Sequence, residues 1–194
     1  MKALKKILAA LLIIIGVLLV ISVFLPSNPH IQRALVMSAP PQILFEQVNV
    51  LKNWEGWSPW LKMEPDMKLA YNDKPSGTGA SYSWVGHKMG EGSITITDCK
   101  PNQEVITLLD FKQQGQATGG FNFLPTTGGT EVVWYFDMSN GMNPIKKYMS
   151  LIMKGMMEKS FDEGLASIKH ISDSIAALPP PAPIPAPSDT TVQQ

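Results

Sequence analysis

Few side chains in this sequence combine a type and a spacing that would support catalysis. The three histidines, His30, His87 and His170, do not stand at ligand spacing from a cysteine, from one another or from a carboxylate pair, so we expect no metal site and no cofactor. His87 and Glu91 form one weak pair, in which a carboxylate could orient an imidazole that acts as a general base. A solvated histidine in a turn is the simpler interpretation of His87.

Motifs of the common hydrolases and nucleotide-binding proteins are not found. The sequence has no Gly-x-Ser-x-Gly elbow, and Gly77-Thr-Gly79 lacks the lysine and the following helix that a phosphate would need. The chain holds 16 basic and 16 acidic residues; without Lys2, Lys5 and Lys6 the basic count is 13, which leaves a net charge of −3. A nucleic-acid partner is therefore not expected.

Apolar side chains offer a second kind of chemistry, which is the binding of an apolar ligand. Methionine is flexible and polarisable, so it suits surfaces that accept several shapes, although simple core filling would explain the same residues. A pocket with few polar groups would select its ligand by size and apolar character. The candidate lining residues come from strands and from one helix: Trp84, Phe121, Phe123, Trp134, Phe136, Met149, Ile152, Met153 and Met156.

Trp54, Trp57 and Trp60 recur every third residue and share a broad helix face. Such an aromatic group usually packs onto the edge of a sheet. The functional alternative is a gate at the mouth of a cavity, or indole rings that rest at the level of the lipid headgroups.

The first 25 residues predict a membrane anchor. Lys2, Lys5 and Lys6 precede Ile7 to Leu25, in which only Gly16 and Ser22 are not hydrocarbon-like. As a helix this run would be about 28 Å long, close to the roughly 30 Å of a bilayer's hydrocarbon layer. A cleavable secretory signal is the alternative, but no Ala-x-Ala site follows. The lysines predict a cytoplasmic N-terminus, with the rest of the chain on the outer, periplasmic side in a Gram-negative bacterium.

The remaining sequence predicts one α+β domain between the anchor and a proline-rich tail. We expect a cytoplasmic start at residues 1–6, the anchor at 7–25, a linker at 26–29, the domain at 30–177 and a disordered tail at 178–194, which could bind a protein partner. A strand at 31–37 and a short helix at 43–48, capped by Ser38, precede a helical segment that Pro59 ends. Alternating apolar residues predict a meander of five strands, at 80–84, 93–97, 105–111, 119–124 and 131–138.

A long helix is predicted to close the domain, with Asn143 as its cap and Pro144 in its first turn. Its apolar residues form two stripes that differ in direction by roughly a third of a turn, so we expect the helix to bend or wrap as it crosses the sheet. The first stripe is Ile145, Met149, Ile152 and Met156, and the second is Phe161, Leu165, Ile168 and Ile175.

This order of elements is that of the helix-grip fold, in which a curved antiparallel sheet wraps around a long C-terminal helix. Asn53-Trp-Glu-Gly-Trp-Ser-Pro-Trp60, after Ser38 to Val48, resembles the opening of the polyketide cyclase/dehydrase-like branch of the START-related SRPBCC superfamily. Gly129-Thr-Glu-Val-Val-Trp134 and Gly164-Leu-Ala-Ser-Ile-Lys169 resemble that branch's penultimate strand and helix end. The resemblance covers residues 30–175, and many members of the branch have an N-terminal membrane segment.

The resemblance implies an apolar cavity between the sheet and the long helix, with two short helices after the first strand. Fold alone does not determine function, so three hypotheses stay open. The first is a membrane-anchored protein that binds an apolar or amphipathic small molecule, such as a lipid, without covalent chemistry. The second is a cyclase- or dehydrase-type enzyme that uses the same cavity, and the third is a structural or interaction domain.

Overall fold

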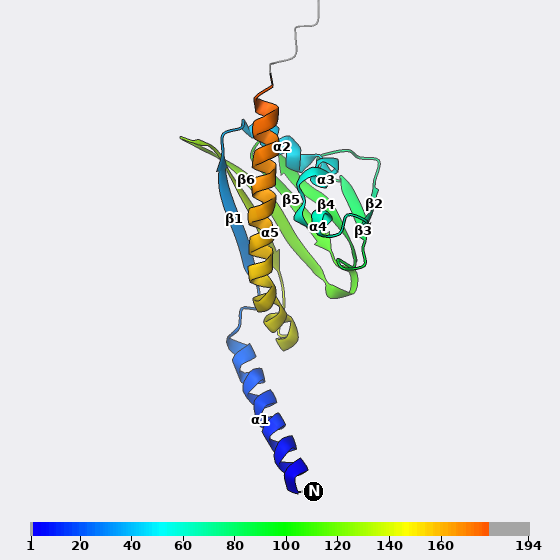
Figure 1. Cartoon of the computed structure of the whole chain (residues 1–194), viewed down its shortest axis with the longest axis vertical. Helices are drawn as coiled ribbons and strands as arrows, with labels where there is room; N and C mark the ends of the chain where they lie inside the picture. Colours follow the sequence, from blue (N-terminus) through cyan, green and yellow to red (C-terminus); the bar gives the residue numbers. More distant parts are fainter. Residues whose placement is uncertain (1, 179–194) are drawn as a thin grey trace, which may run out of the picture.

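A single N-terminal helix precedes an α+β domain in the computed structural model, which describes residues 2–178 (Figure 1). Helix α1 (Lys2–Phe24) leads into a curved seven-stranded antiparallel sheet, and the long helix α5 (Pro144–Ala176) lies against that sheet. This is the α+β helix-grip architecture that the sequence predicts. The disordered tail predicted at the C-terminus lies outside the described residues from position 179 onward.

The sheet is a meander of β2 to β7, and the first strand, β1, pairs with β7 to form one edge. The strand order is β1-β7-β6-β5-β4-β3-β2, and every pair is antiparallel. The meander is confirmed, with one additional strand, β2, that the sequence prediction missed. This strand is four residues long and pairs with β3 alone, so little of the alternation that identifies a strand is present. The strands are β1 (His30–Met37), β2 (Lys68–Tyr71), β3 (Ser81–Val85), β4 (Glu91–Lys100), β5 (Glu104–Asp110), β6 (Gln116–Thr126) and β7 (Gly129–Met138).

Short helices connect β1 to β2: α2 (Pro41–Asn49), the 3-10 turn η1 (Leu51–Asn53), α3 (Trp54–Trp57) and α4 (Pro59–Met63). Two details differ from the prediction. Ser38 does not cap α2; its hydroxyl donates to Asp173 Oδ1 at 3.3 Å. Pro59 also begins α4, because the preceding Ser58 is extended and a proline fits the first turn of a helix.

Helix α5 starts where the sequence predicts. The Asn143 side chain accepts hydrogen bonds from the Ile145 and Lys146 N–H groups, at 3.0 and 3.2 Å. The second predicted stripe carries the residues that pack on the sheet, such as Phe161 and Leu165, whereas the first stripe is exposed. The two stripes therefore belong to one continuous helix, whose first stripe faces solvent and whose second stripe packs on the sheet.

The core is dominated by six aromatic side chains, which we call the aromatic cluster: Trp54, Trp57, Trp60, Phe121, Trp134 and Phe161. Trp134 lies at its centre. Its ring stacks on Phe161 with centroids 4.2 Å apart and on Phe121 at 4.9 Å. Trp57 and Trp60 meet the same ring edge-on, at 5.5 and 5.4 Å. The cluster thus joins β6, β7, the short helices and α5 in one packed contact.

Gly164 allows α5 to approach the aromatic cluster closely. A Cβ at this position would lie 2.6 Å from Cζ3 of Trp134, inside van der Waals contact. The Trp134 ring cannot move aside easily, since four other rings surround it.

A buried carboxylate holds the loop between β3 and β4. Glu64, which follows α4, accepts hydrogen bonds from the backbone N–H groups of His87, Lys88 and Met89; the Lys88 and Met89 bonds are 3.0 and 2.9 Å long. Burial raises the pKa of the Glu64 carboxyl, but these three donors lower it by more, so the pKa lies below its ordinary value.

The Gly164 contact predicts opposite effects for two glycine substitutions in one helix. We expect Gly164→Ala to lower the free energy of unfolding by about 1–3 kcal/mol, because the added methyl group overpacks the core. Gly155→Ala is the control: it has nothing within 4 Å, so it should raise that free energy by about 0.5–1 kcal/mol. Chemical denaturation followed by tryptophan fluorescence would measure both. Equal effects of the two substitutions would contradict the close approach.

Glu64 predicts a pH dependence of stability. Its pKa is lowered in the folded state, so its contribution is present above the unfolded pKa of about 4.3 and is lost as the pH falls through the folded value. We expect Glu64→Gln to lower the thermal midpoint at pH 7 and to reduce the loss of stability between pH 7 and pH 3. Glu91→Gln, at the exposed first residue of β4, should behave as the unaltered protein. An unchanged acid profile in Glu64→Gln would contradict this role.

Candidate functional site

The strand residues predicted to line a pocket all lie on the sheet face that packs against the helices. Trp84, Phe121, Phe123, Trp134 and Phe136 are each exposed by less than a tenth. Phe121 and Trp134 stack within the aromatic cluster, Trp84 and Phe136 both contact Phe111, and Phe123 meets Phe45 edge-on. These five residues are therefore packed core in this structure.

The helix residues predicted to complete the pocket face elsewhere. Met149, Ile152, Met153 and Met156 are 45–69% exposed. At about 100° per residue, the stripe that contains Met149, Ile152 and Met156 is turned by about 150° from the stripe that packs on the sheet, which is more than the third of a turn expected from the sequence. The structure does not bring the helix residues together with the strand residues, so the predicted wall between sheet and helix is not formed.

The tryptophans predicted at a cavity mouth are mostly interior. Trp54 and Trp57 are 3% and 0% exposed, and their indole N–H groups donate to the Val48 and Gln47 carbonyls at 2.9 and 3.0 Å. Trp60 is half-buried against Trp134 and Phe161. Trp54 and Trp57 thus bind the C-terminal turn of α2 to the core, because they satisfy carbonyl groups that the helix leaves free.

The weak acid–base pair is not assembled. His87 and Glu91 are exposed on the β3–β4 loop and its edge, and no hydrogen bond joins their side chains in residues 2–178. The side chain that holds this loop is Glu64, which lies after α4. Its role was not predicted, because a glutamate before a proline in a polar segment gives no local sign of burial. Within the described chain, no three His, Cys, Asp or Glu side chains gather as a metal site would require.

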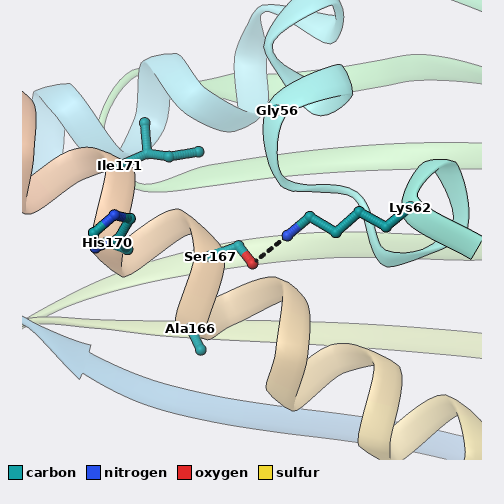
Figure 2. Close-up of a pocket in the computed structure, with 6 residues that line it drawn as sticks. All are labelled: Gly56, Lys62, Ala166, Ser167, His170 and Ile171. Carbon is teal, nitrogen blue, oxygen red and sulfur yellow. Dashed lines mark hydrogen bonds between the residues drawn. The ribbon is translucent and has the colours of Figure 1, made fainter. Parts of the chain in front are cut away.

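A shallow depression lies between α3, α4 and the second half of α5 (Figure 2). It encloses about 300 Å³, opens to solvent and is lined by Gly56, Lys62, Ala166, Ser167, His170 and Ile171. The Lys62 amine donates to Ser167 Oγ at 2.8 Å, and the Ser167 hydroxyl donates to the Glu163 carbonyl. Ser167 therefore has no base that would activate it as a nucleophile.

A second depression, of about 370 Å³, lies near the linker after α1 and is also open. Its lining includes Asn28, Asp137 and Ser139. Asp137 accepts a hydrogen bond from His30 at 2.6 Å, and the pKa of His30 is raised by its hydrogen bonds to Gln32 and Asp137. Both side chains are about half exposed, so this pair belongs to the surface.

The most distinctive surface lies on the first half of α5. We call it the apolar face: Ile145, Met149, Ile152, Met153 and Met156 of α5 and Met142 in the turn before it, with exposed fractions of 45–80%. Apolar side chains that are exposed in a group mark interaction sites more often than single ones do. Helix α5 begins beside the C-terminal end of α1 (Figure 1), to which it is hydrogen bonded through Lys147 and Tyr148. Helix α1 is itself long and apolar enough to cross a membrane, a property that secretory signal sequences share.

Comparisons with known proteins identify the fold. No family model matches the chain, and no curated protein matches its sequence. Among solved structures, the protein of unknown function SA2116 from Staphylococcus aureus is similar, with a TM-score of 0.58, 13% identity and coverage of 76% of this chain and 95% of that one. The Aha1 dimer from Colwellia psychrerythraea is similar with a TM-score of 0.50 and 12% identity. The match covers 77% of this chain and 97% of that one.

DynU16, from the dynemicin biosynthetic locus, gives a TM-score of 0.54 at 13% identity. The match covers 76% of this chain but only 48% of DynU16, so the chain spans about half of that protein. At these identities the three structures show a shared helix-grip fold, and they assign no activity.

Proposed function

We propose that this chain is a membrane-anchored helix-grip protein that binds the apolar part of an amphipathic molecule, with lipid as the ligand class, without covalent chemistry. Helix α1 is the anchor. Its N-terminal lysines remain in the cytoplasm, and the α+β domain stands on the outer side of the membrane.

The apolar face of α5 is the observation that carries this proposal. The domain buries most of its other large apolar side chains, yet six gather here beside the predicted anchor. Burial of an isoleucine or methionine side chain contributes about 1.5–3 kcal/mol, so a ligand that covers several of them could bind by this term alone. The four methionines of the face can adapt to acyl chains of different shape.

The proposed binding surface is the exposed side of α5, whereas the sequence predicted a pocket between the helix and the sheet. In residues 2–178 the aromatic cluster packs between the sheet and the second half of α5, and the two depressions described above lie outside it. The cyclase-type alternative gains no support from the geometry, because His87 and Glu91 are unpaired and the Ser167 hydroxyl is directed to a backbone carbonyl.

Removal of the apolar face should weaken lipid retention. The full-length protein, purified in a mild detergent and transferred to native mass spectrometry, should carry a stoichiometric lipid. We expect the double substitution Met149→Gln and Met156→Gln to weaken retention at least about ten-fold, which corresponds to about 1.4 kcal/mol.

Ile175→Gln is the matched control, because Ile175 is an exposed apolar residue of the same helix, 39% exposed, about 40 Å further along it. Equal lipid retention by all three proteins would contradict the proposal. If the unaltered protein retains no lipid, the proposal fails, and contact with another protein becomes the better explanation of the face.

A further inference from the structure

The end of α1 and the start of α5 are joined by side chains of two adjacent residues. The Lys147 amine donates to the Ser22 carbonyl at 3.1 Å, and the Tyr148 hydroxyl donates to the Leu18 carbonyl at 2.8 Å. Leu18 and Ser22 are one helical turn apart, so the first turns of α5 lie along the last two turns of α1. Lys147 is only 3% exposed.

Further hydrogen bonds fix the linker at the same place. The Asn140 N–H donates to the Ser27 carbonyl at 2.7 Å, and the Asn140 side chain donates to Ser150 Oγ at 2.8 Å. Ser150 in turn donates to the Lys147 carbonyl. Residues 26–29 therefore do not act as a free tether, and the domain is held in one orientation relative to α1.

This geometry sets the depth of α5 if α1 spans the bilayer. The apolar run ends at Leu25, which then lies at the outer boundary of the hydrocarbon layer. Leu18 is seven residues earlier, about 10 Å below that boundary, and Ser22 is about 4–5 Å below it. The Tyr148 hydroxyl and the Lys147 amine bond to these carbonyls, so both side chains reach below the boundary. Tyrosine and lysine are suited to this level, since each has an apolar body and a polar tip.

We propose that the first turns of α5 enter the outer leaflet beside α1, so that lipid acyl chains cover Met142, Ile145 and Met149. This inference rests on the membrane anchoring in the proposed function, and it adds a second, shallow insertion that orients the domain. Ile152 and Met156 continue the apolar face above the membrane surface. A lipid would then meet one uninterrupted apolar stripe from the leaflet to the body of the domain.

The charges of this segment agree with a membrane surface as the partner. From Pro144 to Met156 the helix carries no acidic residue, and two of its three lysines, Lys146 and Lys154, are exposed; the first acidic residue is Glu158. An interfacial helix typically combines an apolar face with lysines that reach the headgroups. A bilayer is favoured over a second copy of this chain because the apolar face continues directly from α1, the element that would already lie in lipid.

A depth measurement tests this inference on the full-length protein. In a Cys99→Ser background, Ile145→Cys would be labelled with an environment-sensitive NBD fluorophore and placed in phosphatidylcholine–phosphatidylglycerol vesicles that contain spin-labelled lipid. We expect a blue-shifted emission and quenching several-fold stronger than at Ile175→Cys, which lies about 45 Å away on the same helix.

A third probe, at Leu12→Cys within α1, separates the two proposals. Quenching at Leu12 without quenching at Ile145 would overturn the shallow insertion and leave the anchor intact. No quenching at Leu12 would overturn both. If a second copy covered the face, the Ile145 probe would be shielded but not quenched by lipid, and its shielding would fall on dilution; that result would also overturn the inference.

Discussion

The contact between Trp134 and Phe161 is the interaction on which the rest of this structure depends. The two rings are nearly parallel, with centroids 4.2 Å apart. They join β7, which is next to the edge strand β1, to the long helix α5. Gly164 permits the approach, and the tryptophans of the short helices close around the same ring. Because this contact lies in the second half of α5, most of the apolar side chains of that half are packed on the domain, whereas most of those in the first half are exposed.

That division of α5 has a functional consequence. A helix-grip domain could bind a ligand beneath its long helix, but here the aromatic side chains take up that space themselves. The apolar residues of α5 that remain accessible face away from the sheet. They lie in the half of the helix that begins next to α1. In the proposed arrangement, the polar contacts that fix α5 to α1 also place the apolar face beside the bilayer, so that the anchor and the proposed ligand-binding surface adjoin.

Local patterns in the sequence were sufficient for most of the elements and for the order that identifies the fold. Alternation identified the strands of the meander, and Asn143-Pro144 located the start of α5, because caps and period-two burial depend on neighbouring residues alone. The strand β2 was missed because four residues at a sheet edge carry too little pattern. Ser58 shows a similar limit: the break before Pro59 was predicted, but the restart of the helix was not.

The site was harder to predict because it depends on contacts between distant residues. Periodicity shows that Met149 and Met156 share a face of a helix, but it does not say whether that face meets the sheet or the solvent. The hydrogen bond from Lys147 to Ser22 joins residues 125 positions apart in the sequence. The hydrogen bonds that Glu64 accepts come from residues more than twenty positions away. Nothing near either residue in the sequence indicates its partner.

Methyl-group NMR on the native methionines would test the central claim most directly, namely that the first half of α5 faces lipid while the interior is packed. The full-length protein would be labelled at its methionine methyl groups and placed in nanodiscs with and without a paramagnetic lipid. The account predicts strong broadening at Met142 and Met149 and none at the buried Met37 or at Met63, which is 45% exposed on α4. Broadening at Met142 and Met149 no greater than at Met63 would contradict it.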